Sequence, residues 1–339
     1  MRKSITPALF ILISIIAISA CKKSKLTDTS PSPGPGVYVV GDASNSTGSG
    51  LALWKNGQLV NIINNVLSGN TNAIAANGND IYTIGILPQA KPAYFKNGGA
   101  AVPLDLGGYT TGGASCIAFQ GNDMYIGGSV SKDTTGVISQ AAYWKNGVLN
   151  VLPGDNAAAY DIAVSGSDVY FCGELISAGS EDWVYWKNGS QPIAAGVYGP
   201  NSIAANGNDV YIGGADSSGN PAYSKNGNSI TVGSNGFVEH IAASSAGVYL
   251  SGQTRIHSTN NAYATYWNNN TATPLFNTTN YSYTGGICVN GSDVYVLGQA
   301  IDLTKNPPQS LGACYWMNGA PVQLTGATVT EVTGIVVIP

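Results

Sequence analysis

One repeated unit dominates the sequence. In its clearest copy, residues Ile203 to Gly214 read Ile-Ala-Ala-Asn-Gly-Asn-Asp-Val-Tyr-Ile-Gly-Gly, and Ala222 to Gly227 then read Ala-Tyr-Ser-Lys-Asn-Gly. The central tyrosine of the unit recurs 38 to 46 residues apart, at Tyr38, Tyr82, Tyr125, Tyr170, Tyr211, Tyr249 and Tyr295. A fixed period of this size with four strand-like segments in each copy indicates a β-propeller of seven blades.

Each copy divides into four short apolar segments, called here strands A to D. In the second copy they are Ala73–Asn77, Ile81–Leu87, Pro92–Asn97 and Ala100–Asp105. The A–B and C–D turns between them are rich in Asn and Gly, which tolerate the positive φ of tight hairpin turns. The sequence therefore predicts an all-β protein whose blades each hold four antiparallel strands.

An aspartate closes the A–B turn in most copies, and it has two possible roles. It recurs as Asp80, Asp123, Asp168, Asp209 and Asp293. We expect this carboxylate to accept hydrogen bonds from turn amides. The alternative is a calcium ligand, but a calcium loop needs more oxygen ligands and a closing bidentate Glu, and no such Glu follows.

The two ends of the repeat region predict how the ring closes. The repeats begin at a strand B, Val37–Gly41, with no strand A before it. They end with Gly334–Ile338, which aligns with strand A of the other copies. We therefore expect the C-terminal strand to complete the first blade, which would remove two open sheet edges.

The repeat resembles the kelch-type propeller repeat. Met124–Gly128 and Val210–Gly214 look like the kelch strand that ends in two glycines, with an aromatic strand downstream. The tyrosine and tryptophan of the downstream strand are adjacent here, whereas the kelch repeat separates them. The chain is also similar to divergent propeller-repeat lipoproteins of bacteria, a resemblance that implies the fold and no single activity.

The N-terminus has the pattern of an export signal. Arg2 and Lys3 precede the apolar run Ala8–Ile18, which is too short to span a membrane as a mature helix. Ile18-Ser19-Ala20-Cys21 looks like a bacterial lipobox, in which Cys21 is lipidated; the alternative is an ordinary secretion signal that happens to precede a cysteine. We expect a signal peptide at 1–20, a lipidated cysteine and flexible tether at 21–36, and the propeller at 37–339.

The composition limits the chemistry that is available. Charged residues make up only 9% of the chain and form no basic stripe, so we expect no nucleic-acid partner. The chain has two histidines and no Cys-x-x-Cys, so we expect neither a metal nor a cofactor. The remaining cysteines are Cys116, Cys172, Cys288 and Cys314, which we expect to be small buried residues. The alternative is a disulfide between Cys288 and Cys314, which belong to the same blade.

Propeller geometry places the B–C and D–A connections on one face, where sequence and length vary. We expect binding there, because variable loops on a rigid scaffold usually carry function. The B–C loops are expected at Asp42–Gly50, Ser129–Gln140, Glu174–Asp182, Gln253–Ala262 and Gln299–Gly312.

Two sets of residues mark a candidate site at the channel mouth on that face. The aromatic set could stack on sugar rings or grip a peptide, or it could pack on the adjacent blades with each hydroxyl satisfied locally. It consists of Tyr109, Tyr160, Tyr198, Phe237, Tyr281 and Tyr283. The charged set, Asp161, Glu239, His240 and Glu331, could supply paired carboxylates or could simply cap a solvated channel.

Together these features predict a membrane-anchored, monomeric propeller of the bacterial cell envelope, on the periplasmic or surface side. It would bind a protein, peptide or carbohydrate without catalysis. The alternative is a glycoside hydrolase or lyase that uses the carboxylates at the channel mouth.

Overall fold

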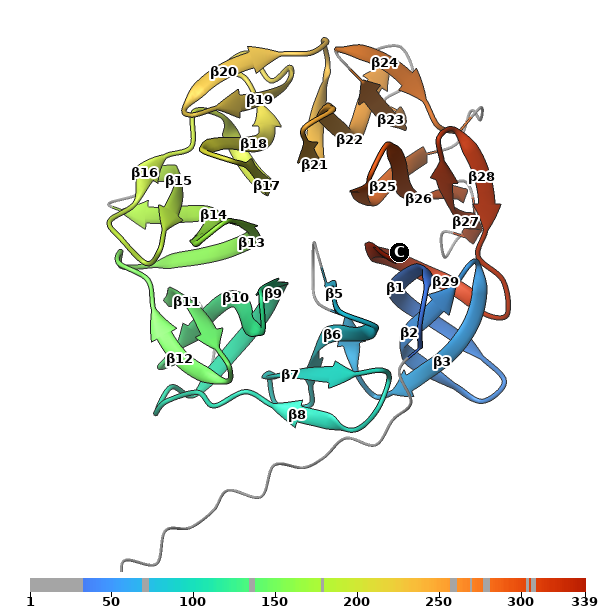
Figure 1. Ribbon diagram of the computed structural model, residues 1–339, viewed down its shortest axis with the longest axis horizontal. Coiled ribbons are helices and arrows are strands. Elements are labelled where there is room, and N and C mark those ends of the chain that lie inside the picture. The colour runs from blue at the N-terminus through green and yellow to red at the C-terminus, as the bar shows by residue number, and fades with distance from the viewer. Residues whose placement is uncertain are drawn as a thin grey trace, which may run out of the picture.

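Seven antiparallel sheets, six of four strands and one of five, stand radially around a common centre in the computed structural model (Figure 1). The structure describes residues 33–68, 73–133, 138–177, 180–256, 261–268, 270–276, 281–302, 305 and 309–339. The predicted signal peptide, Cys21 and most of the tether lie outside these residues. The predicted seven-bladed propeller is confirmed, and the blades are called 1 to 7 in the order of their strand B.

The strands of each blade run outward from the centre in the order A to D. The inner strands A are β29 (Thr328–Ile338), β5 (Ile74–Asn77), β9 (Thr111–Gln120), β13 (Ala157–Ser165), β17 (Tyr198–Asn206), β21 (Gly236–Ser244) and β25 (Tyr281–Asn290). Strands B are β1 (Gly36–Asn45), β6 (Asp80–Leu87), β10 (Asp123–Ser131), β14 (Asp168–Ser177), β18 (Asp209–Ala215), β22 (Gly247–Ile256) and β26 (Asp293–Asp302).

The outer half of each blade is shorter. Strands C are β2 (Gly48–Lys55), β7 (Lys91–Lys96), β11 (Ser139–Lys145), β15 (Ser180–Lys187), β19 (Pro221–Lys225), β23 (Asn261–Asn268) and β27 (Gln309–Met317). Strands D are β3 (Gln58–Asn64), β8 (Ala101–Pro103), β12 (Val148–Val151), β16 (Ile193–Ala194), β20 (Asn228–Thr231), β24 (Thr271–Pro274) and β28 (Ala320–Gln323). In blade 2 a further piece, β4 (Leu67–Ser68), pairs with β6 beside β5.

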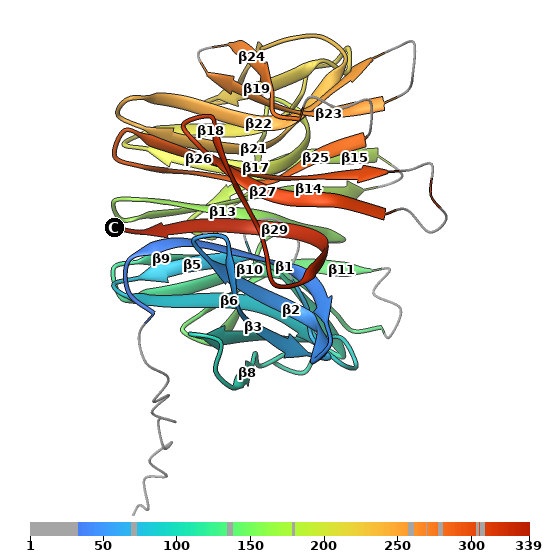
Figure 2. The same cartoon turned by 90° about the vertical axis from the view of Figure 1, so that its right-hand side faces the viewer.

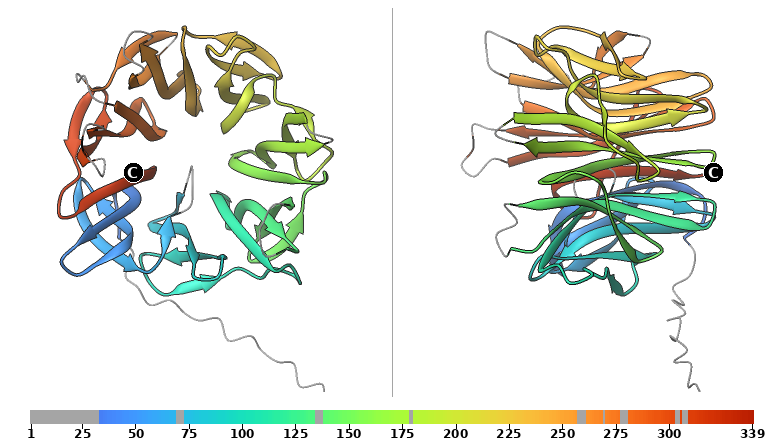
Figure 3. Two further views of the ribbon diagram at one scale, coloured as in Figure 1. Left: turned by 180° about the vertical axis from the view of Figure 1, so that it is seen from behind. Right: turned by 90° about the vertical axis from the view of Figure 1, so that its left-hand side faces the viewer.

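The first blade closes as predicted. Its inner strand is β29, which pairs antiparallel with β1 from Gly36↔Ile338 to Ser44↔Thr328. The chain therefore enters the propeller beside its own C-terminus, on the face that carries the A–B and C–D turns (Figures 2 and 3). We call this the turn face, and the opposite one, with the B–C and D–A connections, the hairpin face.

The B–C segments, expected as loops, are largely strand. In blade 1 the β1–β2 ladder continues to Asn45↔Gly48, so most of Asp42–Gly50 is paired. In blade 4 the ladder continues to Ser177↔Ser180, within the expected loop Glu174–Asp182. Backbone pairing satisfies the amide and carbonyl groups that a loop would leave to water, so the hairpin face presents projecting β-ribbons.

A bulge in the inner strand explains one glycine of the repeat. In blade 3, Gly127 pairs with Cys116 while Gly128 pairs with Ala114, so Ser115 is an extra residue in β9. A Cβ at Gly128 would collide with the carbonyl oxygen of Gly113, which the bulge turns toward it. The equivalent glycines of five other blades also face an inner-strand carbonyl: Gly41, Gly173, Gly214, Gly252 and Gly298. In blade 2, Gly85 faces the carbonyl of Leu67 in β4. The close backbone approach there requires glycine.

Tryptophans lock successive blades together. Trp54, Trp144 and Trp186 are fully buried in the inter-blade cores. Each donates its indole N–H to a carbonyl of the preceding blade: Trp54 to Thr325 at 3.1 Å, Trp144 to Asp105 at 2.6 Å and Trp186 to Pro153 at 2.8 Å. The large buried ring and the satisfied N–H make this contact both apolar and directional.

The A–B aspartate binds the side chains of the C–D turn. In blade 2, Asn97 Nδ2 donates to Asp80 Oδ1 at 2.9 Å, and the Asn97 Oδ1 accepts from the Ile81 N–H at 2.8 Å. Lys96 completes the cluster through a 2.7 Å ion pair with Asp80. The aspartate therefore accepts from a side-chain amide of the neighbouring turn and from a lysine, a pairing that the sequence analysis did not anticipate.

The four described cysteines are free. Cys116, Cys172 and Cys314 are buried and Cys288 is half-buried, so the disulfide alternative for Cys288 and Cys314 is not realised. Within the described ranges, no three His, Cys, Asp or Glu side chains gather as a metal site. None of these residues forms a helix long and apolar enough to cross a membrane.

Candidate functional site

The predicted aromatic residues of the hairpin face differ in their exposure. Tyr198, at the start of β17, is 56% exposed. The other five are half-buried: Tyr109, Tyr160, Phe237, Tyr281 and Tyr283. The sequence did not distinguish Tyr198 from the other five.

Most of the half-buried aromatics have local partners. The Tyr109 hydroxyl donates to Gln140, and Lys132 lies 5.7 Å from the centre of the Tyr109 ring. Tyr283 donates to Gln299 at 2.9 Å, and Tyr281 accepts from Gln253 at 3.0 Å. These contacts match the alternative in which each hydroxyl is satisfied locally.

Two of the four charged residues sit inside the wall of the ring. Asp161 is 3% exposed and follows the bulge at Tyr160. Its Oδ2 accepts from Ser202 Oγ at 2.8 Å and from the Ile203 N–H at 2.9 Å, both in the next blade. Ser202 Oγ in turn accepts from the Ile241 N–H at 3.1 Å, one blade further. The Ser202 hydroxyl donates its proton to the Asp161 carboxylate and accepts from Ile241, so it links blade 5 to blades 4 and 6.

His240 occupies the position of Asp161 and Ser202 in blade 6. It is 7% exposed, and its Nε2 lies 3.3 Å from the carbonyl oxygen of Thr284 in blade 7. Burial lowers the pKa of His240 to about 4, so the ring is neutral at pH 7 and its Nε2–H donates to that carbonyl. Asp161 and His240 therefore do not cap a solvated mouth, because both are held by hydrogen bonds within the wall.

A small polar cavity of about 70 Å³ lies against this network. Asp161, Ser202 and His240 line one side, and Gly286 and Gly334 line the other. This volume suits a few water molecules rather than an organic substrate.

Glu239 is the titratable group of the mouth whose pKa falls near neutrality. It is the bulged residue of β21, between Val238 and His240 in the register. Burial raises the pKa of Glu239 to about 7, although Thr284 Oγ1 donates to its Oε2 at 2.8 Å and Arg255 favours its charged form. A carboxyl group that is part protonated near pH 7 can act as a proton donor.

The charges of Glu239 and of Glu331, the fourth charged residue, both affect Tyr283. Burial, then the charge of Glu331 and more weakly that of Glu239, raise the pKa of the Tyr283 phenol. Glu331 is exposed on β29, and partial burial together with the charge of Asp42 raises the pKa of Glu331. Glu239 and Glu331 are therefore two carboxyl groups of the predicted mouth whose pKa values are raised.

Exposed aliphatic residues on the hairpin face were missed in the sequence. Ile138 is 67% exposed, Ile176 is 37% exposed and Leu311 is 50% exposed, all near the ends of B–C hairpins. The signal for them was present, because each is a large aliphatic residue within a predicted B–C connection. Together with Tyr198, they distribute exposed apolar side chains over four blades of this face.

Comparison with known proteins adds little to this geometry. Neither a protein-family model nor a curated protein matches the chain. Among solved structures, a mutant of AofleA from Arthrobotrys oligospora is similar at 10% sequence identity with a TM-score of 0.41. The alignment covers 85% of this chain and 81% of that one.

Proposed function

We propose that this chain is a lipid-anchored binding protein of a bacterial cell envelope that presents the hairpin face of its propeller to a protein or peptide. The observation that carries the proposal is the position of the chain's first described residues. Gly36 pairs with Ile338 on the turn face, whereas the tip of the same strand, Asn45, pairs with Gly48 on the hairpin face. An anchor that precedes Gly36 would therefore join the propeller at the turn face and leave the hairpin face free to bind a partner.

The tether has enough length to separate the propeller from a bilayer. From Cys21 to Pro33 the extended chain would reach about 40 Å, at roughly 3.3 Å per residue. Its propeller end is held in place, because Lys55 Nζ donates to the Pro33 carbonyl at 2.5 Å and the Tyr38 hydroxyl donates to it at 2.9 Å. The kelch-like repeat and the lipobox support the same assignment, and lipidation would hold the chain at the membrane without a spanning helix.

The exposed side chains favour a protein or peptide over a carbohydrate as the ligand. Ile138, Ile176 and Leu311 offer aliphatic surface, which polypeptide partners bury and sugars contact poorly. Carbohydrate remains the second ligand class, for which the exposed Tyr198 ring would be the stacking platform.

The anchor is tested by fractionation of cells that express Cys21→Ser. We expect the variant to leave the membrane fraction while its thermal melt stays unchanged, and Cys288→Ser serves as the control cysteine. A Cys21→Ser chain that remains fully membrane-bound would exclude lipidation as the anchor.

The binding face is tested by peptide, protein and glycan arrays followed by paired variants of one blade. Ile176 on the hairpin face and Ile193 on the outer strand β16 are similarly exposed, at 37% and 42%. We expect Ile176→Ser to weaken the strongest array interaction about tenfold or more, and Ile193→Ser to leave it unchanged. Equal effects of the two substitutions would remove the hairpin face as the binding surface.

A second candidate function is a glycoside hydrolase or lyase, and the raised pKa of Glu239 favours it. Release of sugars from a panel of polysaccharides would support this activity if Glu239→Gln abolished it and Glu331→Gln weakened it. Hydrolysis that persists in both variants would exclude the mouth as a catalytic site.

A further inference from the structure

A lysine covers the repeat tyrosine in five blades. The ammonium nitrogen lies 5.1 to 5.8 Å from the centre of the ring in each of them. The pairs are Lys55 over Tyr38, Lys96 over Tyr82, Lys145 over Tyr125, Lys187 over Tyr170 and Lys225 over Tyr211. Each pair is cross-strand in the register of strands B and C, so the blade supplies a cation to its own aromatic face.

Blade 6 lacks this cation. Tyr249 pairs in the same register with Asn268, which stands where the other blades have lysine. The A–B turn of blade 6 also lacks the aspartate, because Ala246 and Gly247 precede Val248. Neither of the charges that occupy this position in other blades is therefore present beside Tyr249.

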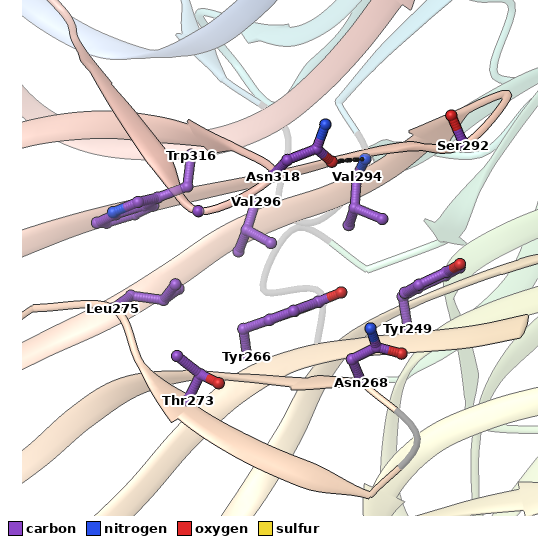
Figure 4. A pocket seen from close by; sticks show the side chains of 11 residues that line it. Tyr249, Tyr266, Asn268, Thr273, Leu275, Ser292, Val294, Val296, Trp316 and Asn318 are labelled. Atoms are coloured by element: carbon purple, nitrogen blue, oxygen red, sulfur yellow. Dashed lines mark hydrogen bonds between the residues drawn. The ribbon is translucent and has the colours of Figure 1, made fainter.

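A cavity of about 400 Å³ opens at this place, between blades 6 and 7 at the turn face. Figure 4 shows Tyr249, Tyr266 and Asn268 on the blade 6 side, with Trp316 and Asn318 across from them. Its volume falls in the range of small-molecule sites, and aromatic rings with a few polar groups line it. The cavity includes the space beside Tyr249 where a lysine would extend in the other blades.

An aromatic contact occupies this junction. Trp316 meets the Phe276 ring edge-on at 4.8 Å between centres. Leu275 is half-buried, whereas Leu152 and Leu324, which end strand D in other blades, are buried. Trp316 and Leu275 both line the cavity, so it extends to the side chains of this junction.

A carboxylate near the cavity belongs to a blade that has no lysine at the repeat position. Asp293 lies between Ser292 and Val294, which both line the cavity, and it accepts from Asn318 Nδ2 at 2.8 Å. In blades 2 to 5 the equivalent aspartate forms an ion pair with a lysine at 2.7 to 2.8 Å. Blade 7 has Met317 at the lysine position, so it supplies no such cation to Asp293.

From these observations we propose that the cavity between blades 6 and 7 binds a small organic ammonium compound whose cation lies over the Tyr249 ring. The ligand's cation occupies the position that lysine fills in five other blades. Tyr266 and Trp316 enclose its alkyl groups, and Asp293 supplies a nearby negative charge. Asn268, Thr273 and Ser292 offer hydrogen-bond partners to a polar substituent, so an amino alcohol such as choline fits the lining. This site lies on the opposite face from the proposed partner surface and does not depend on it.

The test is calorimetric titration of the full chain, purified in an uncharged maltoside detergent, with choline and tetramethylammonium. The control ligand is dimethylbutanol, the uncharged carbon analogue of choline. We expect choline to bind about tenfold or more tightly than dimethylbutanol, because the two have the same shape and differ in the cation. Equal affinities, or no heat of binding with either ammonium compound, would overturn the proposal.

Variants at two positions identify the site. Asn268→Lys should abolish choline binding, because an internal cation then covers Tyr249, while Asn268→Gln should retain binding as the matched control. Tyr249→Leu should weaken choline about tenfold and leave dimethylbutanol unaffected. Choline binding that survives both Asn268→Lys and Tyr249→Leu would place the ligand elsewhere, and tight binding of an uncharged monosaccharide in the cavity would replace the cation with a sugar.

Discussion

Gly36 and Ile338 are paired across β1 and β29, so the first strand of the propeller is hydrogen-bonded to the last. The pairing closes the ring inside a blade, where strand ladders supply the contacts, and leaves no junction that depends on side-chain packing alone. It also places the start of the propeller and its C-terminal end on the same face. Closure and the face on which the chain enters the propeller thus have one structural cause.

Deletion of residues 334–339 should therefore destabilise the whole ring. The deletion removes the ladder from Val40↔Gly334 to Gly36↔Ile338 and the buried side chains of Ile335 and Ile338. Since a single buried Ile→Ala change costs about 2–5 kcal/mol, we expect a loss of more than about 4 kcal/mol in the free energy of unfolding. Denaturant melts measure it, with deletion of residues 22–30 as the control. Equal stabilities of the two truncations would contradict closure by β29.

In the Asp80–Lys96–Asn97 cluster, we expect Asn97 to contribute more to the free energy of unfolding than Lys96. Asn97 has a φ of 53° and makes two hydrogen bonds at 2.8 and 2.9 Å, so Asn97→Ala loses both bonds and strains the backbone. We expect a cost of about 2–3 kcal/mol. Lys96→Ala breaks a partly exposed ion pair and should cost less than about 1 kcal/mol.

Urea melts of both variants at low and high salt separate the two contributions. The Lys96→Ala effect should shrink at high salt, whereas the Asn97→Ala effect should persist. Asn97→Gly, which keeps the positive φ, should recover part of the loss. A larger effect for Lys96→Ala than for Asn97→Ala would show that the ion pair, and not the amide, holds the two turns together.

The repeat period was sufficient to predict the architecture, because a period specifies the number of blades and its phase specifies the closing strand. The first copy of the repeat begins at the strand B that holds Tyr38 and has no strand A before it. Gly334–Ile338 aligns with strand A of the other copies, so the alignment of the repeats alone predicted the closure. The turns could also be predicted from local sequence, since Asn-Gly sequences favour positive φ whatever the rest of the fold.

The site could not be predicted in the same way, because it depends on where repeats depart from one another in space. The extra residue that makes Glu239 a bulge is visible only in the register with β22. Asp161 and Ser202 are 41 residues apart and meet through the contact of two blades. The cavity beside Tyr249 lies where blade 6 has Asn268 and five other blades have a lysine. That difference can be recognised as significant only after the structure shows the five lysine–tyrosine contacts.

Glu239 and His240 predict opposite responses of stability to pH. The folded-state pKa of Glu239, about 7, lies above its ordinary value of 4.5, so its stabilising contribution is complete below pH 4.5 and is lost as pH rises through 7. The folded-state pKa of His240, about 4, lies below its ordinary 6.5, so its contribution is complete above pH 6.5 and is lost as pH falls through 4. Between pH 4.5 and 6.5 the two effects oppose each other.

Glu239→Gln and His240→Asn separate these contributions. Relative to the unmodified chain, Glu239→Gln should gain stability as pH rises from 4.5 to 7, by up to about 3 kcal/mol at about 1.4 kcal/mol per pKa unit. His240→Asn should gain relative stability as pH falls from 6.5 to 4. Chemical denaturation at half-unit pH intervals measures both, and stability differences that do not change with pH would show that neither group titrates with a shifted pKa.

Tyr198 and Tyr283 predict opposite consequences of the same substitution. Tyr198 is 56% exposed, so Tyr198→Ala should change the free energy of unfolding by no more than about 0.5 kcal/mol. If the hairpin face binds the partner, this variant should weaken binding about tenfold or more, because an exposed aromatic residue contributes mainly in a complex. Tyr283 packs against blade 1 and donates to Gln299 at 2.9 Å, so Tyr283→Ala should cost roughly 3 kcal/mol of stability. Thermal melts and binding titrations of both variants with the strongest array ligand test the contrast.

A large loss of stability in Tyr198→Ala would mean that this ring belongs to the packing between blades, and the binding surface would then consist of the aliphatic hairpin tips at Ile138, Ile176 and Leu311.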